Sequence, residues 1–259
     1  MARQVEAMTS ATLITALALP PEARVDRRVP KKLLLEQGAP TAANKRQVND
    51  GIEGLFWVAA LKPTTIGVPE YRDTVREYLE IAVLSLALRP CAKGGRLIEL
   101  VHRAVSYPMW LLTEQESGPN LSLAHKRWSQ GEAGKTVLDG ELVSVDLDGD
   151  FGPRILRAFE KSLAMAEQPR ASLYALYQGW IDTVLALQAA RITGRFDLPT
   201  TASRAAARQE ALREFTRLDA QVASLRAAAA KETQIARQVE INLEHARLNA
   251  ALEAARAQL

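Results

Sequence analysis

The sequence predicts an α+β fold, in which a mixed β-sheet core carries packed helices and is followed by an all-α C-terminal part ending in a long helix or coiled-coil arm. Between Tyr78 and Asp148, β-rich runs and one amphipathic helical segment follow one another with turn residues between them. A strand, a helix and then an antiparallel meander indicate a mixed sheet, and we expect helices to cover one of its faces. Beyond Asp148 no strand pattern remains, and residues 201–259 contain neither glycine nor proline. We therefore expect only helices there.

The composition sets limits on the class of protein. A chain of 259 residues allows one sizeable domain and an appendage. The net charge of +3 is compatible with one local basic surface and no more. The single cysteine, Cys91, excludes an internal disulfide, and the three histidines lack metal-ligand spacing, so we expect neither a metal nor another cofactor. This cysteine usage predicts a cytoplasmic protein of a bacterial type, and no run is long enough to cross a membrane.

The N-terminal third is predicted to begin with a helix over Met8–Leu19 that ends at Pro20. Its apolar run has the length of a signal-peptide core, but an acidic residue precedes it and two prolines follow it, so we interpret it as an amphipathic helix. Residues 25–35 form a basic connector broken by a proline. The connector carries four cations suited to holding phosphates, with a solvated, ion-paired loop as the alternative: Arg27, Arg28, Lys31 and Lys32.

The core elements are predicted from hydrophobic spacing. Helical spacing predicts a helix over Thr41–Phe56, and a strand and turn follow over residues 57–68. Leu79–Leu88 is apolar on both faces, which is typical of a central strand. A helix starts at Gly94 with an apolar inner face. Further strands are expected at residues 108–113, 121–125 and 136–148, the last region holding one or two strands with a turn at Asp139.

The C-terminal part begins with two predicted helices over Arg154–Ala166 and Ala171–Thr193. The long run over residues 201–259 has heptad spacing, weakened where Glu232 falls on a d position. It can pair with another chain or fold back as a helical hairpin. The candidate coiled-coil or partner-interface residues are Phe215, Leu218, Val222, Leu225, Val239 and Leu243.

Three parts are therefore expected. Residues 1–150 form a mixed α/β core domain, residues 151–199 form a helical pair that packs on it, and residues 200–259 form the long helical arm.

No motif identifies a reaction. P-loop, dinucleotide-binding, zinc-protease and nucleophile-elbow motifs are absent from the sequence. A nuclease of the Asp…Glu-x-Lys type needs paired carboxylates and a lysine on adjacent strands, but no acid lies two residues before Lys126. Acids would have to come from Glu80, Glu99, Glu114 or Asp146. The cluster His125, Lys126 and Arg127, beside Trp128, is a second candidate for nucleic-acid contact, with a core-capping tryptophan and solvated cations as the alternative.

Five blocks of sequence together resemble the bacterial domain-of-unknown-function family 4391: residues 28–34 (RVPKKLL), 61–65 (LKPTT), 99–108 (ELVHRAVSYP), 123–127 (LAHKR) and 232–243 (ETQIARQVEINL). The resemblance covers nearly the whole chain. No catalytic residues are established for that family, so the resemblance implies none here. What it implies is a setting, because similar proteins tend to be encoded beside helicases and modification methyltransferases in phage-defence or restriction-modification clusters.

From these features we expect a non-catalytic accessory subunit of a bacterial anti-phage defence complex. It would dock on a helicase or DNA methyltransferase, with DNA as a further contact and no membrane association. Two alternatives stay open at this point: a diverged metal-dependent nuclease, and a structural homo-oligomer built on the C-terminal helices.

Overall fold

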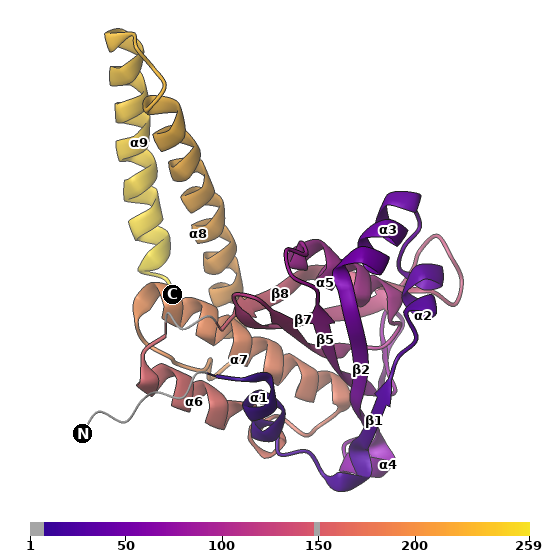
Figure 1. Cartoon of the computed structure of the whole chain (residues 1–259). Helices are drawn as coiled ribbons and strands as arrows, with labels where there is room; N and C mark the ends of the chain where they lie inside the picture. Colours follow the sequence, from indigo (N-terminus) through magenta and orange to yellow (C-terminus); the bar gives the residue numbers. More distant parts are fainter. Residues whose placement is uncertain (1–7, 148–150) are drawn as a thin grey trace, which may run out of the picture. The chain divides into compact units, whose positions relative to one another are not determined.

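A six-stranded mixed sheet forms the core of the computed structural model, which describes residues 8–147 and 151–259 (Figure 1). The strand order is β1-β2-β5-β6-β7-β8. Only β5 and β6 are parallel, and all other neighbours are antiparallel. The strands are β1 (Arg24–Arg28), β2 (Ile52–Leu61), β5 (Ile81–Leu88), β6 (Met109–Gln115), β7 (Gly118–Trp128) and β8 (Thr136–Asp146), with β3 (Tyr71–Arg72) and β4 (Glu77–Tyr78) as a separate small hairpin.

Seven helices precede residue 200 in the described ranges, and the last of them is the longest. They are α1 (Ser10–Ala16), α2 (Lys31–Gln37), α3 (Ala42–Gly51), α4 (Pro63–Ile66), α5 (Gly94–Ala104), α6 (Pro153–Leu163) and α7 (Leu173–Thr193), with 3₁₀ turns at Pro21–Ala23 and Met165–Glu167. The chain divides into two compact units, residues 1–184 and 185–259, and the division falls inside α7. Within the described ranges, no helix is both long enough and apolar enough to span a membrane.

One face of the sheet packs against α2, α3 and α5 (Figure 1). The crossover helix α5 joins the parallel strands β5 and β6, a connection that no tight turn can make. Its apolar residues Leu97, Ile98 and Val101 are buried together with Leu84 and Leu111 of the sheet. This is the inner face that the spacing of the sequence predicted.

The opposite face is covered as well, by α1, α6 and the first half of α7, so the expectation of helices on only one face was wrong. Tyr177 of α7 donates a hydrogen bond to the carbonyl of Met109 at 2.7 Å and accepts one from the amide of Ala124 at 2.9 Å. The indole of Trp180 donates to the Leu163 carbonyl of α6 at 2.9 Å. The central strands are therefore buried on both sides, which requires a helical layer on each face.

Several predicted boundaries differ from the structure. The helix expected over residues 41–56 ends at Gly51, because Ile52 pairs with Leu88 and begins strand β2. The basic connector becomes the edge strand β1 and helix α2. The region expected to hold one or two strands is one continuous strand, β8. It bulges at residues 140–142, opposite Ala124 of β7, and Gly140 adopts a positive φ of 81° there. Such an irregularity bends a strand without ending it.

The second unit contains a helical hairpin of α8 (Ala202–Ala229) and α9 (Ile235–Arg256), which pack against each other. Leu218 and Val222 of α8 are buried, and Phe215 and Leu225 are half-buried on the same side. On α9 the positions with low exposure are different from those predicted. Val239 and Leu243 are 53% and 60% exposed, and the half-buried or buried seam contains Ile241, His245, Leu248, Leu252 and Ala255 instead. The break after Ala229 resets the helical phase, so the heptad of α8 does not continue through α9.

Gly38, which follows α2, provides a test of how closely α2 and α5 approach. A Cβ atom there would lie 2.5 Å from the Cβ of Ala104 and 2.7 Å from the carbonyl oxygen of Leu100. We expect Gly38→Ala to lower the free energy of unfolding by about 1–3 kcal/mol, the usual cost of overpacking. Urea denaturation followed by circular dichroism measures this change. Gly95→Ala is the matched control, because nothing lies within 4 Å of a Cβ at that helical position. Equal stability of the two variants would contradict the close approach.

Candidate nucleic-acid interface

Cations from three segments converge where strand β2 begins. Arg28 of β1 donates a hydrogen bond to the Glu53 carbonyl at 3.4 Å, and Lys31 of α2 donates one to the Ile52 carbonyl. The amide of Arg89, which follows β5, donates to the Gly51 carbonyl at 2.8 Å. Burial lowers the pKa of Lys31, and the positive charges of Arg89 and Arg28 lower it further. The three segments that carry these cations therefore meet at the start of β2.

A cavity of about 450 Å³ extends this surface between α3 and the loop before α5. Gly51 contributes to its wall, together with Arg46 and Asp50 of α3 and Lys93 of the loop. Arg46 and Lys93 are exposed. We call the five cations around Gly51 the basic corner: Arg28, Lys31, Arg46, Arg89 and Lys93. Two carboxylates, Asp50 and Glu53, lie among them, so cations are in excess.

An exposed aromatic ring lies beside this corner. Phe56 of β2 is 43% exposed, and the guanidinium carbon of Arg28 lies 5.9 Å from its ring centroid. Clustered cations hold phosphates, and an exposed ring offers a stacking surface. The combination is typical of a nucleic-acid contact surface.

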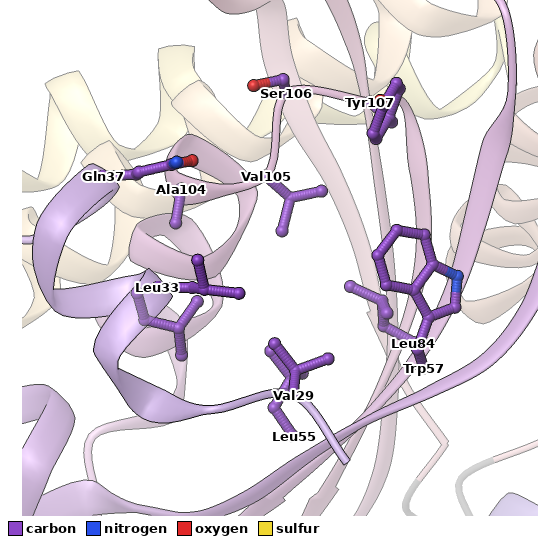
Figure 2. Close-up of a pocket in the computed structure, with 11 residues that line it drawn as sticks. Val29, Leu33, Gln37, Leu55, Trp57, Leu84, Ala104, Val105, Ser106 and Tyr107 are labelled. Atoms are coloured by element: carbon purple, nitrogen blue, oxygen red, sulfur yellow. The ribbon is translucent and has the colours of Figure 1, made fainter. Parts of the chain in front are cut away.

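A second, more apolar cavity of about 270 Å³ adjoins the same segment (Figure 2). We call it the α2 pocket, since α2 forms one of its walls. In Figure 2 the rings of Trp57 and Tyr107 lie on one side of it, and Leu33, Gln37 and Ala104 lie on the other. The lining residues are Val29, Leu33, Leu34, Gln37, Leu55, Trp57, Leu84, Ala104, Val105, Ser106 and Tyr107.

The sequence prediction identified part of the basic corner. Arg28 and Lys31 belong to it, whereas Lys32 forms an exposed ion pair with Glu36 at 3.6 Å. Arg27 is exposed, and within the described part of the chain its side chain forms neither an ion pair nor a hydrogen bond. Arg46, Arg89 and Lys93 were missed. They occur singly in three separate stretches of sequence, and only the fold brings them together.

The second predicted cluster lies elsewhere in the sheet. Strand β7, which carries His125, Lys126 and Arg127, is four strand spacings from β1. At about 4.8 Å per strand this corresponds to roughly 19 Å. The two predicted cationic clusters therefore do not form one surface.

Lys126 is buried, so its prediction as a nucleic-acid contact was wrong. Its ammonium group donates hydrogen bonds to the carbonyl of His102 and, at 2.9 Å, to that of Val105. These carbonyls lie at the C-terminal end of α5, where the last turn of a helix lacks internal partners and carries partial negative charge. Burial lowers the pKa of Lys126 to about 7, while the two carbonyls favour its charged form. Lys126 thus caps α5 from a neighbouring strand.

His125 and Arg127 are half-buried and are held by other side chains. Nε2 of His125 lies 2.8 Å from Oε1 of Gln178, which only accepts, so Nε2 carries the proton. Nδ1 then accepts a hydrogen bond from the hydroxyl of Tyr78. The ring stacks on Tyr174 with centroids 5.0 Å apart. Nε of Arg127 lies 3.7 Å from a carboxylate oxygen of Asp139. His125 and Arg127 therefore stabilise this end of the sheet.

The acids required by the nuclease alternative are dispersed. Glu80 pairs with Lys62 at 3.2 Å, and Glu99 pairs with Arg103 at 2.6 Å. Asp146 accepts a hydrogen bond from Asn120 at 2.8 Å. In the ranges that the structure describes, no three His, Cys, Asp or Glu side chains are grouped as metal ligands would be. Because Lys126 is engaged with α5, it is not placed to orient an attacking water, and the arrangement gives this alternative no support.

Comparison with known proteins assigns the chain to a family. The family model described as "Domain of unknown function (DUF4391)" matches residues 17–252. The chain belongs to this family. The match confirms the resemblance found in the sequence blocks and includes the basic corner, the α2 pocket and most of the α8–α9 hairpin. No curated protein and no solved structure matches the chain.

His102 is a further buried polar residue near Lys126. Its Nε2 lies 3.0 Å from the hydroxyl of Ser122, and burial followed by the charge of Lys126 lowers its pKa to about 3. An unfolded histidine binds a proton near pH 6.5, so between these values the unfolded chain binds more protons than the folded one. The free energy of unfolding therefore decreases as the pH falls from 6.5 towards 3.

This residue yields a test of stability against pH. Between pH 7 and pH 4.5, His102 alone should lower the free energy of unfolding by roughly 2–3 kcal/mol. His102→Gln keeps a donor for the Ser122 hydroxyl but does not titrate in this range. Urea denaturation at the two pH values should therefore show a smaller decrease for the variant than for the wild type, by that amount. If the stability of both proteins decreases equally, His102 is not the buried neutral histidine described above.

Proposed function

We propose that this protein is a non-catalytic accessory subunit of a bacterial anti-phage defence complex of the restriction-modification type, docking on a helicase or DNA methyltransferase and contacting DNA. The observation that carries the proposal is the basic corner. Its five cations come from β1, α2, α3 and the two ends of the β5–α5 loop, and few carboxylates oppose them. Such a surface attracts a polyanion without needing a large net charge on the whole chain.

The absence of a catalytic role is supported by how the reactive groups are used. Lys126, His102 and the Tyr78–His125 pair have shifted pKa values, which in many proteins mark active sites. Here burial is the main cause of each shift. The same groups bond to backbone carbonyls or to neighbouring side chains inside the sheet. They therefore serve the fold, and the surface features that remain are those of a binding protein.

The docking role is supported by the outer side of α9. Val239 and Leu243 are largely exposed apolar side chains one helical turn apart, and the α8–α9 hairpin does not bury them. Exposed apolar residues in adjacent turns of a helix are suited to packing against another protein. We propose a helicase or methyltransferase as the partner because of the gene setting that the resemblance to family 4391 implies.

DNA binding can be tested by removing charge from the basic corner. The triple variant Arg28→Gln, Arg46→Gln, Arg89→Gln should bind duplex or single-stranded DNA more weakly, because fewer phosphates are neutralised. The slope of log K against log salt should become less steep by roughly one for each phosphate that no longer meets a cation. Fluorescence anisotropy over a range of salt concentrations measures both quantities.

The control removes as much charge from the opposite side of the sheet. Arg154, Arg157 and Lys161 of α6 are exposed cations, and changing all three to Gln should leave affinity and salt slope nearly unchanged. If both triple variants weaken binding equally, the attraction is a general effect of net charge and the basic corner is not the DNA site.

Docking through α9 has its own test. We expect Val239→Glu with Leu243→Glu to reduce recovery of a co-expressed helicase or methyltransferase from the same gene cluster at least ten-fold in a tagged pull-down, because buried carboxylates at an apolar contact are unfavourable. Ala223→Glu with Ala227→Glu, at exposed positions of α8, is the control with equal charge. Unchanged recovery with the α9 variant would contradict docking through this surface. A wild-type dimer that the α9 variant makes monomeric would instead favour the homo-oligomer.

A further inference from the structure

We infer that the α2 pocket binds one unpaired nucleobase, and that the nucleic acid recognised by this protein is therefore single-stranded. The inference rests on the proposed DNA contact and deepens it, since it names the form of nucleic acid and the group that is recognised. The observations behind it are the shape and lining of the pocket and its position beside the cations.

The size of the pocket limits what can enter. Its volume of about 270 Å³ is slightly below the range of roughly 300–1,000 Å³ typical of pockets for drug-sized ligands and cofactors. One ring system fits such a space, whereas a whole nucleotide cofactor does not. Leu55 and Leu84 are buried residues of the sheet, while Leu33 and Tyr107 are exposed and lie nearer to solvent. The pocket is therefore closed on the sheet side and open towards solvent.

The lining suits the faces and the edges of a base. Trp57 and Tyr107 present aromatic rings on one side of the pocket, and Leu33 presents an apolar surface opposite them (Figure 2). A base enclosed in this way can stack on a ring, which every base does regardless of sequence. Gln37 and Ser106 are exposed polar residues of the lining, and their side chains can hydrogen-bond to the edge of a base.

The cations and the pocket are built from the same short segment. In residues 27–34, Val29, Leu33 and Leu34 line the pocket, whereas Arg28 and Lys31 extend to the carbonyls of Glu53 and Ile52 at the basic corner. Because Lys31 stands between the lining residues Val29 and Leu33, a strand whose base enters the pocket passes close to that cation.

The charge around the pocket favours a base over an apolar side chain of a partner protein. A partner segment would need carboxylates beside its apolar anchor to match Arg27, Arg28 and Lys31, whereas every nucleotide carries a phosphate. In a duplex the bases are paired and stacked, and a base must leave the stack before it can enter a pocket. The pocket thus selects single strands.

The test compares three ligands with the full-length chain by fluorescence anisotropy. They are a short labelled oligothymidylate, the same strand with abasic sites at its central positions, and a blunt duplex. Tyr107, 39% exposed, is the residue to change, since its removal leaves no buried cavity. Tyr107→Ala should weaken binding of the intact strand about 5- to 100-fold, the effect of removing one stacked base, and should leave binding of the abasic strand and the duplex unchanged. Tyr107→Trp keeps a ring and should retain wild-type affinity.

A second variant tests the pocket by partly filling it. Ser106→Phe adds a ring at an exposed position of the lining and should weaken binding of the intact strand as Tyr107→Ala does. Thermal denaturation confirms that each variant is folded. Wild-type affinity of both variants for the intact strand would overturn the inference and leave the pocket for a partner's side chain.

Failure of this inference and failure of the proposed function give different results. If the triple variant of the basic corner no longer binds DNA but the pocket variants still do, the DNA contact stands and the base-binding inference falls. If the wild type binds none of the three ligands, the DNA contact itself is refuted, and the inference falls with it.

Discussion

The parallel pairing of β5 with β6 is the constraint on which the rest of the core depends. Two parallel neighbours cannot be joined by a tight turn, so the chain must cross one face of the sheet as helix α5 before it enters β6. This crossing brings the C-terminal end of α5 against the sheet, where its last carbonyls need donors. Lys126 supplies them from β7, and Gly38 lets the end of α2 approach α5 closely. The α2 pocket lies where β1, α2 and the end of α5 meet above β2.

Composition cannot distinguish a buried cation of this protein from the exposed cations of the basic corner. Lys126 is buried, and its charge is matched by the carbonyl end of a helix. Arg28, Arg46, Arg89 and Lys93 are exposed, and the segments that carry them meet near the start of β2. The same division applies to the aromatic residues, since Tyr78 and Tyr177 complete hydrogen bonds inside the core while Phe56 and Tyr107 are accessible. The proposed binding function rests on the second group in both cases.

Sequence patterns were most reliable where burial is extreme. Leu79–Leu88 was correctly assigned to a central strand because both of its faces are apolar, and the inner face of α5 was correct for the same reason. The error at residues 52–56 arose because Ile52 and Leu55 also fit helical spacing when the residues before them are helical. Pairing with β5 decided between the two states, because Ile52 pairs with Leu88 and Leu55 with Leu86. Partners more than thirty residues later are not visible in a local pattern.

The sequence by itself determined that the chain is an α+β protein with a helical C-terminal part, and that a basic segment precedes the core. Its hydrophobic periodicity carries that information directly, because burial acts on each element separately. Only the tertiary structure decided which cations are exposed together. Arg46, Arg89 and Lys93 are far from Arg28 along the chain, and Lys126, adjacent to two other cationic candidates, is turned into the core by the alternation of side chains along a strand. A surface is made by elements that meet in space, so its composition is a property of the packing and not of any one stretch of sequence.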